Sequence, residues 1–116
     1  MLSVENLIGC VYEVHMAITS SVSPDGKQVT IFIQGRFDFS SHQDFRNAYE
    51  HLNPTPSQYR VDLQGASYLD SSALGMLLLL RDHAGGDQSN VQIVNCSQDV
   101  KKILAISNFE QLFEIF

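Results

Sequence analysis

Three consecutive polar residues, Asp70, Ser71 and Ser72, stand where the pattern of a buried strand gives way to that of an apolar helix. A helix N-terminus carries unpaired backbone N–H donors and a partial positive charge. It can hold a phosphate group without a metal ion or basic side chains. A serine in this first turn is therefore a candidate phosphorylation site. The simpler interpretation is that Asp70 is only an N-cap and that the two serines only fill the turn.

Other chemistries have little support in the residue pattern. The segment from Gly65 to Leu69 comes near the G-x-S-x-G elbow of hydrolases but lacks the second glycine that the sharp turn requires. No G-x-x-x-x-G-K-[ST] nucleotide loop is present. The histidines lack metal-ligand spacing and are expected at the surface or at helix ends: His15, His42, His51 and His83. We therefore expect no catalytic residue, no metal site and no cofactor.

The composition indicates one small acidic domain. The chain has 116 residues and a formal net charge of −6, which disfavours nucleic acid and anionic membranes, because both are bound largely through cationic side chains. The apolar run from Leu74 to Leu80 is far shorter than the roughly 20 residues that span a bilayer. The N-terminus lacks a basic secretory signal, and the isolated Cys10 and Cys96 predict buried, reduced thiols. We expect a cytoplasmic protein.

The periodicity of apolar residues predicts an α/β fold. Strands are expected at residues 17–23, 29–34, 59–63 and 91–94, and helices from Ser40-Ser41 to Leu52, over 70–84 and over 99–106. One hairpin, turning at Pro24–Lys27, precedes the crossover units, so the sheet should be mixed and four- to five-stranded, and packed against helices. The domain should span residues 17–116, after an N-terminal extension of uncertain structure at 1–16.

Four details of these elements are expected. Ser40 or Ser41 should cap the first helix, and the strand at 29–34 should have both faces partly covered. Residues 65–67 should form a short connection. The helix at 70–84 is apolar nearly all round and should be buried. Because a glycine inside a helix costs stability, Gly75 should mark a close approach to the sheet.

Three motifs in order resemble those of bacterial anti-sigma-factor antagonists, the STAS family. Residues 70–75, Asp-Ser-Ser-Ala-Leu-Gly, are similar to the D-S-S-G-L-G signature of that family. Residues 35–38 match its G-x-(apolar)-D turn, and residues 100–104 with Ser107-Asn108-Phe109 resemble its late helix and following turn. The resemblance runs from about Ala17 to Phe113 and implies the STAS fold.

The resemblance also implies a function. In that family the serine directly after the aspartate, here Ser71, is phosphorylated by a GHKL-type kinase that is also an anti-sigma factor, and a PP2C-type phosphatase removes the phosphate. The unphosphorylated protein binds the anti-sigma factor and so frees the sigma factor. By the same comparison, the switch surface comprises Asp38, Asp70, Ser71 and Ser72. This chain departs from the family in having Ala73 for the usual glycine and in ending at Phe116, where many members continue into a closing helix.

Two alternatives remain open within the same family. The chain could be a STAS module that serves as a structural subunit of a lipid or anion transport system, without a phosphorylation cycle. It could also relay to a target other than a sigma factor, such as a flagellar or second-messenger regulator.

Overall fold

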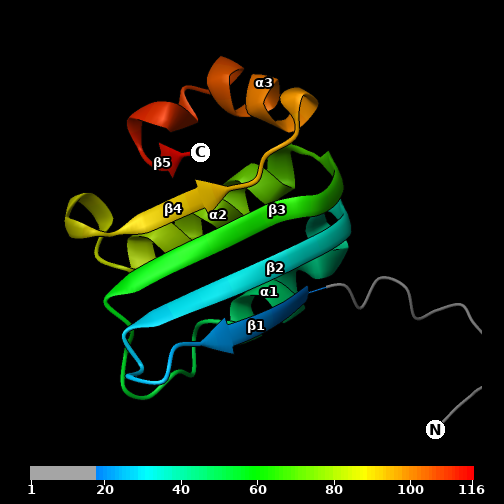
Figure 1. Cartoon of the computed structure of the whole chain (residues 1–116). Coiled ribbons are helices and arrows are strands. Elements are labelled where there is room, and N and C mark those ends of the chain that lie inside the picture. The colour runs from blue at the N-terminus through cyan, green and yellow to red at the C-terminus, as the bar shows by residue number, and fades with distance from the viewer. Residues whose placement is uncertain (1–17) are drawn as a thin grey trace, which may run out of the picture.

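The structure, a computed structural model, describes residues 18–116 (Figure 1). A five-stranded sheet, with its strands in chain order, forms the centre. The strands are β1 (Ile18–Val22), β2 (Gln28–Phe37), β3 (Gln58–Leu69), β4 (Val91–Val94) and β5 (Glu114–Ile115). β1 is antiparallel to β2, and the other neighbours are parallel. The predicted mixed sheet is confirmed, while the expected extension at 1–16, with Cys10 and His15, lies outside the described residues.

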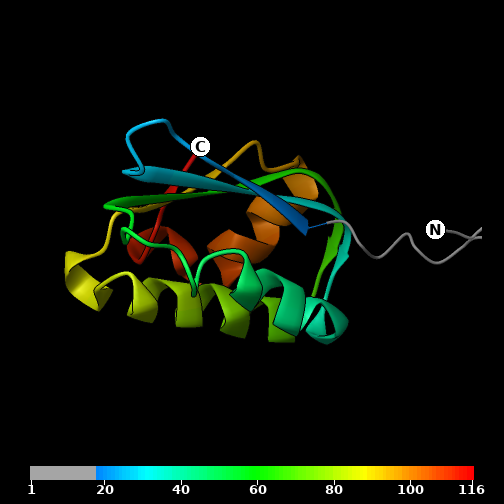
Figure 2. The same ribbon diagram turned by 90° about the horizontal axis from the view of Figure 1, so that it is seen from below.

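The helices connect the parallel strands and lie together on one side of the sheet (Figure 2). They are α1 (His42–Asn47), α2 (Ser71–His83) and α3 (Gln98–Ile106), with 3₁₀ turns η2 (Phe39–Ser41), η3 (Gly86–Gln88) and η4 (Phe109–Gln111). Gly85 and Gly86, both with positive φ, follow the end of α2 as predicted. The expectation of a serine cap at Ser40 or Ser41 is wrong. The Asp38 side chain instead accepts a hydrogen bond from the Ser40 N–H and caps η2.

The core lies between the sheet and the helices. Alternate residues of β2 and β3, including Ile31 and Leu63, are fully buried against Leu77 and Leu80 of α2. The other face of the sheet is open, and no helix of residues 18–116 covers it (Figure 2). Phe32 on that face is 37% exposed. Thr30 on the same face is half-buried, so this face of the strand is partly covered, as predicted.

The strand that leads to the candidate site is much longer than predicted. β3 does not end at Leu63 but stays paired with β2 through Leu69, with two register shifts on the way. Gly65 and Ala66, expected in a short connection, are paired with Gln34 and Gly35 instead. The long strand delivers the chain directly to Asp70 without an intervening loop, which fixes where α2 begins.

Helix α2 is buried on one side only. Ala73, Met76, Leu77 and Leu80 face the core, whereas Leu78 and Leu79 are 40% and 54% exposed. A methyl group added at Gly75 would meet nothing within 4 Å. The expectation that this helix is buried thus holds for its core face only, and the expectation that Gly75 lies close against the sheet is wrong. Neither α2 nor any other helix in residues 18–116 has the length and apolar character needed to cross a membrane.

Candidate functional site

Asp38 and Asp70 lie at the same edge of the sheet. β2 and β3 are parallel neighbours, and their last residues, Phe37 and Leu69, are paired. Each aspartate directly follows one of these residues and caps a helical segment. Because the carboxyl ends of parallel strands meet at one edge, the strand register brings together two acidic residues that are far apart in the sequence.

Asp70 holds the first turn of α2 together. Its Oδ1 accepts hydrogen bonds from the Ala73 backbone N–H at 3.0 Å and from the Ser72 hydroxyl at 2.6 Å. The Ser72 bond is the largest cause that holds the pKa of Asp70 below its usual value, and the Ala73 N–H adds to it. The charge of nearby Asp38 acts in the opposite direction. The Ser72 hydroxyl is therefore engaged within the turn.

Ser71 is placed differently from Ser72. It is the first residue of α2, its side chain is exposed, and its hydroxyl makes no hydrogen bond to any other residue of the 18–116 segment. The adjacent carboxylate of Asp70 is directed to Ser72 and Ala73 instead. Of the two hydroxyls at the helix start, only that of Ser71 is both accessible and unengaged.

Asp38 lies in a small network that the sequence did not reveal. Its Oδ1 accepts hydrogen bonds from the Ser40 N–H and hydroxyl, and its Oδ2 lies 3.3 Å from Arg36 Nε. The Ser40 hydroxyl is the largest cause that lowers the pKa of Asp38. The Arg36 guanidinium also lies 4.3 Å from the ring centre of Tyr68, its neighbour across β2 and β3. The site thus has one cation, Arg36, tied between a carboxylate and an aromatic ring.

The remaining sequence candidates lie apart from this site. No group of three or more His, Cys, Asp or Glu in residues 18–116 is arranged to hold a metal ion. His42 begins α1, His83 ends α2 and His51 is exposed, as predicted. Cys96 is a free, half-buried cysteine, and burial raises the pKa of its thiol.

Comparison with known proteins identifies the family. Residues 20–114 match a family model described as "Mlab, STAS domain". The chain belongs to the STAS domain family. A STAS-domain containing protein of Pseudomonas aeruginosa is 67% identical over 100 residues, which cover 86% of this chain and 99% of that protein.

Solved structures agree on the STAS fold. The unphosphorylated form of the anti-sigma factor antagonist SpoIIAA has a TM-score of 0.68 at 16% identity, covering 86% of this chain and 87% of that one. A sulfate transporter family protein from Wolinella succinogenes has a TM-score of 0.69 at 15% identity, covering 83% and 80% of the two chains. At such identities the similarity establishes the fold alone, which is shared by an anti-sigma factor antagonist and a sulfate transporter family protein.

Proposed function

We propose that this STAS domain is an anti-sigma factor antagonist controlled by phosphorylation of Ser71. In its unphosphorylated form it binds an anti-sigma factor that has GHKL-type serine kinase activity, and phosphate on Ser71 ends that binding. A PP2C-type phosphatase restores the first form. The domain acts as a binding protein rather than an enzyme, in the cytoplasm, without contact to nucleic acid or membrane.

The exposure of the Ser71 hydroxyl carries this proposal. A kinase must reach the oxygen that it phosphorylates, and Ser71 is exposed while Ser72 donates to Asp70. The product also suits the position, because a phosphate at the first turn of a helix is stabilised by the helix dipole and by backbone N–H groups. The fold should therefore tolerate the modification.

The same charge would disturb a partner. A phosphoserine adds roughly −1.5 to −2 charges at pH 7. Asp70 precedes Ser71, and Asp38 is close enough to affect the Asp70 carboxylate. A third anionic group makes this edge of the sheet costly to desolvate against a partner, and like charges across an interface cost several kcal/mol. Phosphorylation thus favours release without unfolding.

Phosphopeptide mapping of the protein isolated from its native cells tests the proposal. Trypsin cleaves after Arg60 and Arg81, so one peptide carries Ser67, Ser71 and Ser72, and fragmentation spectra assign the phosphate among them. We expect phosphate on Ser71 alone. Phosphate on either of the other serines would contradict the assignment.

A chain that is never phosphorylated in the presence of its partner would favour the structural-subunit alternative. Co-purification from the native cells distinguishes the phosphorylation switch from the structural subunit directly. A small GHKL-type kinase in the complex supports the switch, and an ATP-binding transporter subunit supports the structural role.

A further inference from the structure

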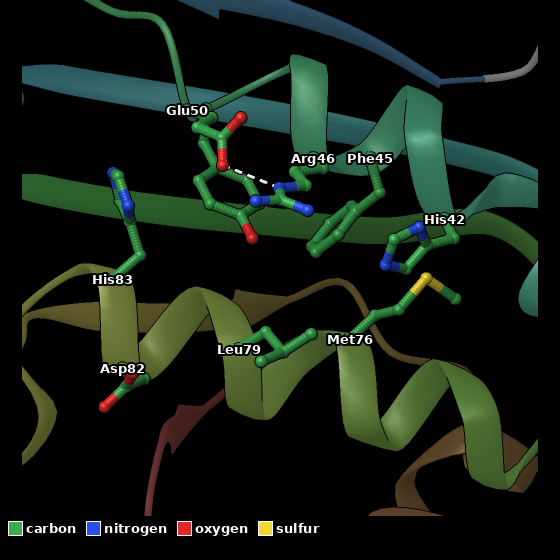
Figure 3. A pocket seen from close by; sticks show the side chains of 9 residues that line it. His42, Phe45, Arg46, Glu50, Met76, Leu79, Asp82 and His83 are labelled. Carbon is green, nitrogen blue, oxygen red and sulfur yellow. Dashed lines mark hydrogen bonds and ion pairs between the residues drawn. The ribbon is translucent and has the colours of Figure 1, made fainter.

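A groove between α1 and α2 lies outside the site at Ser71 (Figure 3). Its volume is about 260 Å³. Phe45 of α1 and Tyr49, which follows that helix, line it on one side. Met76 and Leu79 of α2 line it on the other side. Small-molecule sites usually measure about 300–1,000 Å³, so this groove better fits one or two apolar side chains of another protein.

The walls of the groove include apolar surface that the fold leaves in contact with solvent. Leu79 lines it and is 54% exposed. His42 also lines the groove, and its ring stacks on that of Phe39, which is 70% exposed. Gly75 lies on the outward side of α2, with open space where a side chain would be. A partner helix could therefore approach the α2 backbone closely at this point.

Two carboxylates but only one arginine line the groove, together with two histidines: Glu50, Asp82, Arg46, His42 and His83. Its one arginine, Arg46, is paired with Glu50, with Nε 2.6 Å from Oε2 (Figure 3). Arg81, the arginine of α2, is paired with Asp87. Asp82, which also lines the groove, has no salt bridge with any residue of the described chain. A cationic side chain on the partner would supply the missing counter-charge.

We infer that the α1–α2 groove is a docking site for a basic amphipathic helix of a partner protein. One or two apolar residues of that helix, spaced i and i+3 or i+4, enter the groove against Leu79 and Met76. Lysine or arginine residues beside them face Asp82. The site uses neither Ser71 nor its phosphate, so it is independent of the proposed switch and would provide a second contact surface.

Peptide titration of the nitrogen-15-labelled full chain, followed by two-dimensional NMR, tests the inference. The probe is a synthetic peptide with leucines at i, i+4 and i+7 and lysines elsewhere; its control carries glutamates in place of the lysines. The leucine–lysine peptide should shift amide signals of α1 and α2 around the groove, and its affinity should fall between about 50 and 500 mM NaCl. The glutamate peptide should leave these signals unchanged. Binding should be the same for Ser71→Asp, which separates this test from that of the switch.

Two neighbouring leucines provide a matched pair of variants. Leu79→Gln removes an apolar side chain that lines the groove and should weaken peptide binding roughly tenfold, as loss of a central apolar contact does. Leu78→Gln alters an exposed leucine outside the lining and should change affinity less than about twofold. Glutamine is a good helix former, so both variants should keep the wild-type melting temperature. The inference would be overturned if no shifts appear around the groove or if the glutamate peptide binds equally well. It would also be overturned if both variants lose affinity equally, or if raising the protein concentration alone gives the same shifts.

Discussion

The carboxylate of Asp70 accepts a hydrogen bond from only one of the two serines that follow it. It accepts the hydroxyl of Ser72 together with the Ala73 N–H, and this pairing leaves Ser71 facing solvent. A local capping pattern therefore determines which hydroxyl is accessible. The difference follows from the helical geometry of the first turn rather than from any special chemistry of either serine.

Variants at Ser71 should separate partner binding from folding. Ser71→Asp adds a negative charge next to Asp70 and should reduce affinity for the cognate kinase-like partner at least tenfold, since like-charge contacts cost several kcal/mol. Ser71→Ala adds no charge and should bind like the unphosphorylated protein. Calorimetric titration measures both affinities, and circular dichroism checks that both variants are folded. Equal binding by two folded variants would mean that the residue is no switch.

Variants at Asp70 should show what the cap contributes. Asp70→Ala removes the acceptor of the Ser72 and Ala73 hydrogen bonds and should lower the melting temperature. Asp70→Asn keeps a side-chain oxygen in the same place and should be less affected. Ser72→Ala, which leaves the Ala73 bond intact, should also be milder than Asp70→Ala. If Asp70→Ala melts like the wild type, the cap contributes little to the stability of α2.

The resemblance to the STAS family supplied Ser71 and Asp38 as candidates, but it did not show their surroundings. The helix start at Asp70 could be placed from the residues themselves, because capping is local and readable from a few residues. The Arg36 guanidinium over Tyr68 depends on the register of two strands separated by a helix. That register includes two irregular shifts, which no local pattern specifies, so this contact could not be predicted.

At the scale of elements, α2 is where sequence reasoning and structure differ most. Its run of apolar residues from Leu74 to Leu80 offers no polar periodicity by which to tell the inner face from the outer one. The structure buries Leu77 and Leu80 and exposes Leu78 and Leu79. The apolar outer face is then surface in excess of what the core requires. Likewise, β5 has only two residues, too few for a period-two pattern to identify it as a strand.

The open space around Gly75 means that a larger residue there should stabilise the fold, whereas a close approach to the sheet would have made it destabilising. A glycine within a helix costs up to about 1 kcal/mol relative to alanine, and the added methyl group meets nothing within 4 Å. Gly75→Ala should therefore stabilise the protein by about 0.5–1 kcal/mol, raising the melting temperature by a few degrees. Differential scanning calorimetry measures this shift.

Gly65→Ala is the matched control for that change. A methyl group at Gly65 would come within 2.7 Å of Gln34 Cγ and 3.3 Å of its Cα. Since part of this contact is backbone of the paired strand, Gly65→Ala should lower the melting temperature. A loss of stability in Gly75→Ala similar to that in Gly65→Ala would contradict the open space described at Gly75.

The described residues 18–116 form two layers, a sheet and a layer of helices on one of its faces. This arrangement leaves separate surfaces at which a partner could bind. The helices cover one face of the sheet (Figure 2), and the open face carries hydrogen-bonded polar residues such as Arg60 and Gln92. The Ser71 site lies at the carboxyl ends of β2 and β3, where side chains from two strands meet. The α1–α2 groove lies on the helical side. Two separate surfaces are thus available for partners.

Acid should destabilise the molecule through several carboxylates that share one physical cause. Hydrogen bonds donated to their ionised forms lower the pKa values of Asp25, Asp38, Glu50 and Asp70. A folded-state pKa below the unfolded value means that the folded state binds fewer protons. The resulting stability is fully present above the unfolded values, 3.8 for aspartate and 4.5 for glutamate, and is lost as the pH falls through the lower folded values.

The melting temperature should consequently fall as the pH is lowered from about 5 toward 2, and these groups should have no effect on it between about pH 6 and 8. Thermal unfolding followed by circular dichroism across this range measures the profile. Asp70→Asn cannot titrate but still offers an acceptor oxygen, so it should show a shallower decline below pH 4 than the wild type. An Asp99→Asn control alters an exposed aspartate of α3 and tests for a general effect of charge. Equal acid profiles in wild type and Asp70→Asn would show that the cap at the start of α2 contributes nothing to the pH dependence. They would contradict a pKa of Asp70 that folding lowers through its hydrogen bonds.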